Sequence, residues 1–285
     1  MTPRLALAAG LLLAGLALES LWPLRRATRS KPKRVAVNLA LAVTATLILR
    51  ATFYPPVMKL AGVVALHRWG LFGRLSLPSP WRTALGLLTL DYTLYLWHRL
   101  NHGPAFLWRF HNVHHADLDM DVSTASRFHF GELILSSGFR AGQVALLGID
   151  PVTLILFETL ITSAAQFHHA NVRLPIRLER ALNLLFVTPR MHGIHHSLVQ
   201  GETDSNYSTI FSIWDRLHGT NRLGVPQGDI VIGVPGYRDE RELTFWGCVL
   251  LPFRQLRSWR MDDGSIPARS PAGASQSSRF ETLVA

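Results

Sequence analysis

The N-terminal apolar run limits this chain more than any other feature, because it is long enough to cross a lipid bilayer. Residues 5–22, LALAAGLLLAGLALESLW, carry only one charge, Glu19, and a helix of about 20 apolar residues spans the hydrocarbon layer. Residues 25–34, RRATRSKPKR, then bring six positive charges. Because cytoplasmic loops are enriched in Lys and Arg, we interpret 5–22 as a retained span with its N-terminus outside.

The composition supports a membrane protein over a nucleic-acid-binding one. Hydrophobic residues make up 48% and charged residues 17%, with 29 Lys and Arg against 19 Asp and Glu. A basic balance fits either nucleic acid or an anionic membrane surface, but here the basic residues flank apolar runs and no nucleic-acid-binding motif occurs. The single cysteine, Cys248, excludes an internal disulfide framework and a CxxC metal knuckle.

Further apolar segments predict more helices in or against the membrane. Residues 35–49 form a second span that ends before Pro55–Pro56, and 81–97 form a third. Residues 133–167 read as a helical hairpin joined at the sequence GIDP, with arms short for a full crossing. The side on which 50–82 lies stays open, because its arginines favour the cytoplasm whereas the flanking spans require the outside or a re-entrant loop.

Three short motifs place histidines at helical spacing. HRLNH holds two histidines at i and i+4, and HNVHH and HGIHH each hold three at i, i+3 and i+4, so each motif presents its imidazoles on one helix face. The eight residues are His98, His102, His111, His114, His115, His192, His195 and His196. Eight imidazoles exceed the four ligands of one tetrahedral ion and suit two ions. A nitrogen-only set disfavours Mg²⁺ and Ca²⁺ and leaves Fe, Zn, Cu or Ni.

An acidic residue precedes the first histidine motif on the same predicted helix face. Asp91, Tyr95, His98 and His102 stand at offsets of 0, 4, 7 and 11. A carboxylate inside an apolar span is costly and is a functional candidate. We therefore predict that Asp91 accepts the second N–H of an imidazole ligand, or holds Tyr95 or an arginine. The isolated His67 and His218 are interpreted as ordinary surface or core residues.

The order and surroundings of these motifs resemble the fatty acid hydroxylase superfamily, also called the sterol desaturase family, of integral membrane di-iron enzymes. The resemblance covers about residues 85–255 and includes DYTLYLWHRLNH, FHNVHHADLDMDVSTASRFHFGE, QFHHANVRLP, TPRMHGIHHS and NYSTIFSIWDRLHGT. It implies metal ligation by the eight histidines above and by His169. It further implies His129 and His168 as additional ligand candidates, and Asn206, Tyr207 and Asp215 as residues behind the ligands. His218 departs from the family pattern, where Phe is frequent.

The resemblance also implies a fold and an activity. The fold would be an all-α integral membrane helical bundle with a histidine-rich helical cap on the cytoplasmic side that carries a di-metal site. Residues 1–80 would be an N-terminal transmembrane region, 81–260 the catalytic domain and 261–285 a disordered tail. The expected activity is O₂-dependent hydroxylation or desaturation of a lipid C–H bond by two iron ions, with zinc as a substitute in purified protein.

The expected oxidation consumes two electrons, yet the chain has no dinucleotide-binding GxGxxG motif and no cysteine set for an iron–sulfur cluster. A separate electron-donor protein is therefore expected, and the basic surface could be its docking site or could only orient the chain in the membrane. Three alternatives stay open: a membrane metal transporter or storage protein, a zinc-dependent membrane hydrolase, and an inactive lipid-binding relative. The histidines lie in polar stretches beyond the spans, whereas a transporter places ligands near the midplane.

Overall fold

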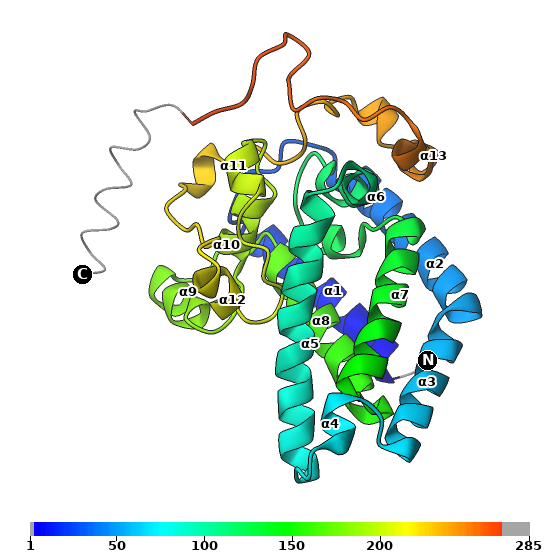
Figure 1. Cartoon of the computed structure of the whole chain (residues 1–285). Coiled ribbons are helices and arrows are strands. Elements are labelled where there is room, and N and C mark those ends of the chain that lie inside the picture. Colours follow the sequence, from blue (N-terminus) through cyan, green and yellow to red (C-terminus); the bar gives the residue numbers. More distant parts are fainter. Residues whose placement is uncertain (1–2, 270–285) are drawn as a thin grey trace.

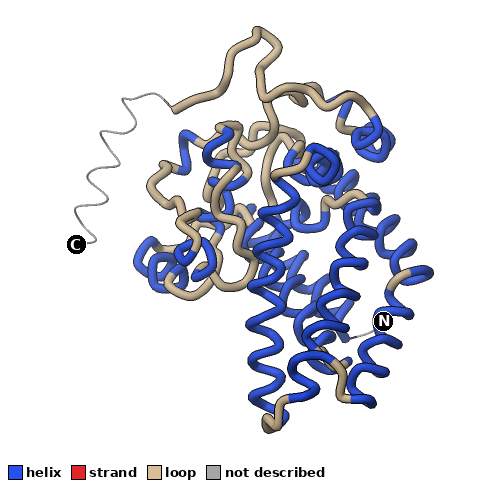
Figure 2. Tube along the Cα trace, viewed as in Figure 1, coloured by secondary structure: helices blue, strands red, loops and turns tan. Residues whose placement is uncertain are grey.

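Every regular element among the described residues, 3–269, is a helix (Figure 2). The structure is a computed structural model. Three isolated β-bridges join loop residues, and no strand forms in this part of the chain, so the predicted all-α class is confirmed. The α-helices are α1 Pro3–Leu21, α2 Lys31–Thr52, α3 Tyr54–His67, α4 Gly70–Arg74, α5 Ser79–His102, α6 Ala105–His115, α7 Phe130–Leu147, α8 Pro151–His169, α9 Ile176–Asn183, α10 Pro189–His195, α11 Gln200–Thr203, α12 Ile213–Leu217 and α13 Phe245–Leu250. The 3-10 helices are η1 Val122–Ser126, η2 Gln227–Asp229, η3 Glu240–Glu242 and η4 Leu251–Phe253.

The long helices form a bundle, and the shorter helices other than α4 lie around the end at which α5 stops (Figure 1). The bundle core is apolar and draws on several helices, including Val64 of α3, Leu90 of α5, Val144 of α7 and Phe157 of α8, all buried. Burial of such side chains supplies most of the favourable free energy of folding. The bundle thus fixes the positions of α5 and α8, which both carry histidines to the same end.

Prolines set the break between the second and third helices. α2 ends at Thr52 and α3 begins at Tyr54, with Pro55 and Pro56 inside the first turn of α3. A proline lacks the N–H that an interior helical position donates, whereas the first turn needs no such donor. The predicted break at this dipeptide is confirmed.

The predicted hairpin of 133–167 is also confirmed, as α7 and α8. Gly148 ends α7 with a φ of 79°, a conformation that glycine adopts without strain. Asp150 begins α8, and its side chain accepts hydrogen bonds from the amides of Val152 and Thr153. Because the two helices are antiparallel, the start of α7 and the end of α8 lie at the same end of the bundle.

The connection between α3 and α5 lies at the other end, away from the histidines. α4 packs against α7, and Gly70 approaches the hairpin turn so closely that a Cβ there would lie 2.3 Å from the amide nitrogen of Gly148. From this end α5 runs back through the bundle to His102 (Figure 1). The segment 68–78 is thus separated from the histidine motifs by the length of α5.

Two helices of the described chain, α1 and α2, are long and apolar enough to cross a membrane. They match the predicted first and second spans. The predicted third span, 81–97, lies within α5, which is not among them. The reason is that the second half of α5 is not apolar throughout: it packs its polar residues against the loop between α11 and α12, as described below. The predicted disordered tail, 261–285, falls mainly outside the described residues, and its first part, 261–269, is a loop.

Candidate metal centre

The first two histidine motifs lie on two consecutive helices, and the chain changes direction between them. HRLNH forms the last turns of α5, and HNVHH forms the last turns of α6. Gly103 and Pro104 separate the helices, and Pro104 is the residue before the first turn of α6. Because Pro104 has no N–H to continue the hydrogen bonds of α5 and its own backbone is extended, α5 stops at His102 and α6 starts in a new direction. The two motifs therefore face each other.

The remaining ligand candidates come from α8 and α10. His169 is the last residue of α8. HGIHH occupies α10, which begins at Pro189 and ends at His195, so that His196 is its C-cap. α8 and α10 pack together. The helical spacing predicted for all three motifs is therefore present in the structure.

Nine imidazoles gather into two groups, in each of which one ligand atom per residue lies within 4.8 Å of all the others. The five-histidine group consists of His98, His102, His111, His115 and His195. The four-histidine group consists of His114, His169, His192 and His196. These nine residues are the nine that the sequence and the family resemblance predicted as ligands, although the grouping was not predicted. Four helices from three separate parts of the sequence thus converge on one place.

Hydrogen bonds fix the ring orientation in the five-histidine group. The Nδ1 atoms of His98 and His195 lie 2.7 Å from the backbone carbonyl oxygens of Tyr207 and Ser205. A carbonyl only accepts, so each Nδ1 carries the proton and each Nε2 of the neutral ring carries a lone pair. Yet these two Nε2 atoms face each other at 3.1 Å. Two facing lone pairs repel unless a cation lies between them.

The four-histidine group shows the same arrangement. Nδ1 of His169 donates to the carbonyl oxygen of Ala165, one turn earlier in α8, at 2.8 Å. Its Nε2 lies 3.2 Å from Nε2 of His114 and 3.1 Å from Nε2 of His192, which in turn lies 3.2 Å from Nε2 of His196. Four nitrogens therefore converge on one point.

These distances fit transition-metal ligation. An ion at about 2.0–2.1 Å from each nitrogen, with ligand angles between square and tetrahedral, sets neighbouring nitrogens roughly 3.0–3.4 Å apart. The Nε2 atoms of His111 and His115 are also buried and have no hydrogen-bond partner among the described residues. Because buried polar atoms are almost always partnered, these atoms point to ions as their partners. The residues present fit a pair of imidazole-bound ions.

The two groups lie side by side. The rings of His115 and His196, one from each group, are stacked with centroids 4.4 Å apart. Burial lowers the pKa of both imidazoles well below the ordinary value, and neighbouring imidazoles lower it further. Neutral rings with free lone pairs are the form that binds metal. The site is therefore prepared for two adjacent ions.

Glu132, to which sequence reasoning gave no role, supports the five-histidine group. Its carboxylate accepts from Nδ1 of His111 at 2.8 Å and is buried. A carboxylate behind a ligating imidazole fixes the ring and raises its basicity. A carboxylate of Asp204 also lies 3.4 Å from Nδ1 of His102. The signal for Glu132 was its place in the motif RFHFGE, one turn after His129 at the start of an apolar helix.

Three of the predicted supporting residues, Asp215, Tyr207 and Asn206, support the centre through hydrogen bonds with backbone groups. Asp215 accepts from the amide nitrogens of Tyr207 and Ser208, at 2.8 and 2.9 Å. Tyr207 in turn accepts from His98 through its carbonyl, as described above. The side chain of Asn206 donates to the carbonyl oxygen of Met191, beside His192, at 2.9 Å. The loop between α11 and α12 thus positions ligands on both α5 and α10.

The prediction for Asp91 is wrong. Among the described residues its carboxylate forms no hydrogen bond or ion pair with an imidazole, tyrosine or arginine, and instead accepts from the amides of Ile210 and Phe211 and from Nε1 of Trp214. The helical offset placed Asp91 on the correct face of α5, but the loop between α11 and α12 occupies that face below the histidines. Asp91 therefore anchors this loop to α5.

Tyr95 lies on the same face and also misses the ligands. Its hydroxyl bonds to that of Thr220 at 3.0 Å, and its ring stacks on His218. His218 is thus a packing residue, as the sequence suggested. The other isolated histidine, His67, stacks on Trp69 at the far end of α3.

The two additional ligand candidates lie outside both groups. Nδ1 of His129 accepts from the amide of Gly131 at the start of α7, and its Nε2 bonds to the carbonyl of Val249. His129 therefore caps a helix. Nδ1 of His168 bonds to the carbonyl of Thr209, and its ring contacts that of His192 at 4.1 Å between centroids. Both histidines pack the surroundings of the centre.

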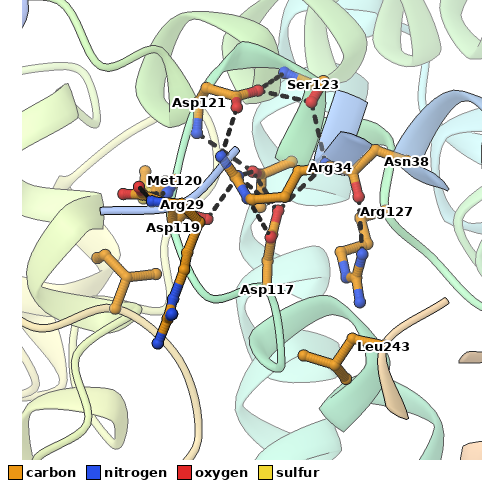
Figure 3. Close-up of polar contacts among 12 residues, drawn as sticks. Arg29, Arg34, Asn38, Asp117, Asp119, Met120, Asp121, Ser123, Arg127 and Leu243 are labelled. Carbon is orange, nitrogen blue, oxygen red and sulfur yellow. Dashed lines mark hydrogen bonds and ion pairs between the residues drawn. The ribbon is translucent and has the colours of Figure 1, made fainter. Parts of the chain in front are cut away.

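The segment after HNVHH is tied down by the basic segment 25–34 (Figure 3). Arg34 binds both carboxylate oxygens of Asp117, at 2.6 and 2.8 Å, and one of Asp121 at 2.9 Å. Burial alone would raise the pKa of Asp117, but Arg34 and Arg127 outweigh it and hold that pKa well below its usual range. Lys31 and Arg29 pair with acidic residues as well, with Glu19 and Glu240. The basic segment therefore offers less free charge to a docking partner than its sequence indicates.

Comparison with known proteins now decides the family. Residues 83–220 match the family described as fatty acid hydroxylase, and every member of both histidine groups lies in this range. Residues 83–220 are a fatty acid hydroxylase domain. The resemblance to the superfamily is thus confirmed, and the match ends before the predicted limit at 255.

Three curated relatives are similar to this chain. Ornithine lipid hydroxylase OlsE of Rhizobium tropici is 32% identical over 186 residues, 65% of this chain and 55% of the relative. Alkylglycerol monooxygenase of Caenorhabditis elegans is 30% identical over 155 residues, covering 53% and 30%. A cholesterol 25-hydroxylase-like protein of Danio rerio is 33% identical over 143 residues, covering 49% and 55%. The chain spans about half or less of the length of these relatives, and no solved structure matches it significantly.

Proposed function

We propose that this chain is a membrane-bound di-iron oxidoreductase that uses O₂ to hydroxylate or desaturate a C–H bond of a lipid. The observation that carries the proposal is the pair of adjacent groups in which nine imidazoles turn lone pairs toward one another. The relatives are named as hydroxylases and monooxygenases of lipids. These names favour an oxidase over the transporter, the zinc hydrolase and the inactive relative considered from the sequence.

The five-histidine group would hold one ion and the four-histidine group the other. Two iron ions, when bound, supply the activation of O₂ and the removal of hydrogen from an unactivated C–H bond. Zinc takes the same ligands and is expected in protein purified without iron. His129 and His168 stay outside this proposed ligand set because neither belongs to a group of converging ligand atoms, and both ring nitrogens of His129 bond to the backbone.

The chain's own residues orient the ligands and exclude water. Backbone carbonyls of Tyr207, Ser205 and Ala165 hold Nδ1 protons and so aim Nε2 lone pairs inward. Glu132 does the same for His111 with a full negative charge. Seven of the nine imidazoles are buried, so that bulk water is kept from the reacting C–H bond.

The membrane arrangement follows from α1 and α2. Only 11% and 17% of the residues in their apolar stretches are fully buried inside the molecule, which leaves side chains on both helices to contact lipid. The loop between them contacts the histidine end, since Trp22 and Leu24 pair with 171–173 next to His169. Because this loop is strongly basic, the positive-inside rule supports our proposal that the histidine centre lies on the cytoplasmic side of a multi-pass protein.

The domain boundaries that we propose reflect function, because the regions on either side of the first boundary pack into one core. We retain 1–80 as the membrane-anchoring region, 81–260 as the catalytic domain and 261–285 as a tail. The bundle core joins both of the first two, for instance through Val64 and Leu90. The electrons for the reaction would come from a separate donor protein, for which 25–34 offers Arg26 and Lys33 as exposed charges.

The proposal is tested with the iron-loaded full chain, lipid extracts, a reductant and ¹⁸O₂. Lipid mass spectrometry should show one labelled oxygen gained, or two hydrogens lost, in a lipid that needs both O₂ and iron. His115→Ala and His195→Ala should abolish turnover while the protein still inserts into membranes. Retained turnover in either variant would contradict the ligand assignment, and product formed without O₂ would contradict the proposed reaction.

A further inference from the structure

A cavity of about 260 Å³ lies between the ends of the two candidate membrane helices and the histidine centre. Its exposed side includes Ser20, Pro23 and Arg26, and its buried side includes Arg25 and Asn171. Asn171 follows His169 by two residues. The cavity therefore lies beside the segment that follows α8 and its last residue, His169.

Arg25 is built into the wall of this cavity. Its backbone amide donates to the side chain of Asn171 at 2.9 Å, and its carbonyl accepts from the same side chain at 2.8 Å. Its Nη1 donates to Gln227 at 2.6 Å. The guanidinium lies directly on α10, where a Cβ on Gly193 would come within 2.3 Å of Nη1. Glycine at the centre of HGIHH thus makes room for Arg25 beside His192.

One donor of this arginine is left over. Arg25 is only 7% exposed, and its Nη2 is buried without a hydrogen-bond partner among the described residues. Burial lowers the pKa of Arg25 to about 10, so it still carries its charge at neutral pH. A buried charge with an unused donor is costly unless an anion completes it. The neighbouring Arg26 is exposed and forms no ion pair among the described residues.

The acidic residues Asp119 and Glu19 of the cavity attract the charge of Arg25, but neither accepts a hydrogen bond from its Nη2 among the described residues. Glu19 already accepts from Lys31 and from the amides of Val122 and Asn171, at 2.6–2.8 Å. Asp119 accepts from the amides of Thr28 and Arg29. Asp121 is bound by Arg34 and Ser123. With these carboxylates satisfied, Arg25 and Arg26 remain as the cations available to a ligand.

The position of the cavity indicates where the anion comes from. It lies where α1 ends and α2 begins, which under the proposed function is the level of the lipid head groups. Leu21 and Trp22 beside it are 66% and 58% exposed, as expected of side chains that contact lipid. An arginine fork binds carboxylate or phosphate with two parallel hydrogen bonds.

We propose that Arg25 and Arg26 bind the anionic head group, a carboxylate or a phosphate, of the lipid substrate. This inference rests on the proposed function for the role of the lipid as substrate. It adds a substrate class, since an uncharged sterol or alkylglycerol would leave Nη2 of Arg25 unpaired. Gly193 is a positioning residue in the same arrangement, because any side chain there displaces the guanidinium.

Binding without turnover tests the head-group site. The metal-loaded full chain in uncharged detergent is titrated with dodecyl phosphate, laurate, dodecanol and inorganic phosphate, and native mass spectrometry counts the bound molecules. We expect one dodecyl phosphate or laurate per chain, and at least about ten-fold weaker binding of dodecanol, which lacks the charge-assisted hydrogen bonds. Dodecanol binding as tightly as dodecyl phosphate would overturn the proposal. Inorganic phosphate binding equally tightly would overturn the assignment to a lipid.

Substitutions test whether these arginines bind the head group or only support the fold. Arg25→Gln should weaken binding of dodecyl phosphate by about ten-fold or more, and Arg26→Gln by about two- to five-fold because this residue is exposed. Lys33→Gln, in the same basic segment but outside the cavity, is the matched control and should change binding less than about two-fold. If Arg25→Gln fails to fold, Arg26→Gln and Arg25→Lys decide. Unchanged binding in the folded variants contradicts the site.

The same preparations keep this inference apart from the proposed function. Iron content and ¹⁸O incorporation are measured on each variant alongside binding. If the unmodified chain binds dodecyl phosphate through Arg25 but holds no iron, the proposed oxidation fails while the anion site stands. If iron and turnover are present but the charged amphiphile binds no better than dodecanol, the head-group site fails and the oxidation stands.

Discussion

The two histidine groups differ in how their rings are held from behind. In the five-histidine group, Nδ1 atoms donate to carbonyls of the loop between α11 and α12 and to the carboxylate of Glu132. In the four-histidine group, only His169 has such a partner, a carbonyl of its own helix, and the other three Nδ1 atoms are unpartnered among the described residues. The difference teaches that one ion would sit in a charged, rigid cage and the other in a looser one beside the cation Arg25.

The largest effect on iron content and turnover is expected in the four-histidine group, because it has fewer ligands to lose. His169→Ala leaves three nitrogens in the four-histidine group, fewer than the four that complete a tetrahedral ion. We expect iron to fall from about two to about one per chain and turnover to fall by more than about 100-fold, beyond what outer residues cause. Metal analysis and the ¹⁸O₂ assay measure both, with His67→Ala as the control.

The five-histidine group provides the contrast. His98→Ala leaves four nitrogens there, enough for an ion, so iron content should stay closer to two per chain than in His169→Ala. Equal iron loss in the two variants would show that the groups do not differ as proposed. Two iron atoms retained in His169→Ala would remove this residue from the ligand set.

A chelator should remove the two proposed ions at different rates. Carboxylates behind imidazoles raise their basicity, and a nearby cation opposes a bound ion. Incubation of the iron-loaded chain with a chelator should therefore release one ion about ten-fold faster than the other. Iron remaining in the protein is measured against time, and His169→Ala, which keeps only the better-held ion, should show the slow phase alone.

A smaller effect is expected at Glu132. Glu132→Gln keeps an acceptor for His111 but removes its charge, and should weaken iron retention in the slow phase by about ten-fold. Glu158→Gln, whose carboxylate pairs with Arg4 away from the centre, is the matched control. If Glu132→Gln speeds only the fast phase and leaves the slow phase unchanged, Glu132 acts on the four-histidine group, which contradicts its proposed role in the five-histidine group.

The histidine motifs were predictable because ligand spacing on a helix is a local property. The intervals in HRLNH, HNVHH and HGIHH specify a face, and the helices α5, α6 and α10 carry that face as expected. The helix ends were predictable for the same reason, through Pro55–Pro56 and the turn before Pro151. Each depends on residues within one or two turns.

The division into two groups was not predictable, because it depends on contacts between helices. HNVHH divides, with His114 in one group and His111 and His115 in the other. HGIHH divides in the same way, with His195 apart from its neighbours. In both motifs the i and i+4 histidines share a group and the i+3 histidine joins the other, but which of the two groups each histidine joins depends on how the four helices pack together. Glu132 escaped notice likewise, because its partner is 21 residues away.

Asp91 gives the smallest expected effect on metal and shows how an outer acid differs from Glu132. Asp91→Asn places an NH₂ group against the donors at Phe211 or Trp214, and an unsatisfied buried donor costs about 1–3 kcal/mol. We expect a lower Tm in detergent, with iron retention within about two-fold of the unmodified chain. An unchanged Tm with ten-fold weaker iron retention would instead restore Asp91 to the role behind a ligand that its helical position suggested. Tm and iron retention together therefore decide whether an acidic residue on the ligand face of α5 supports the metal or anchors the loop. Its position along α5 alone does not distinguish these two roles.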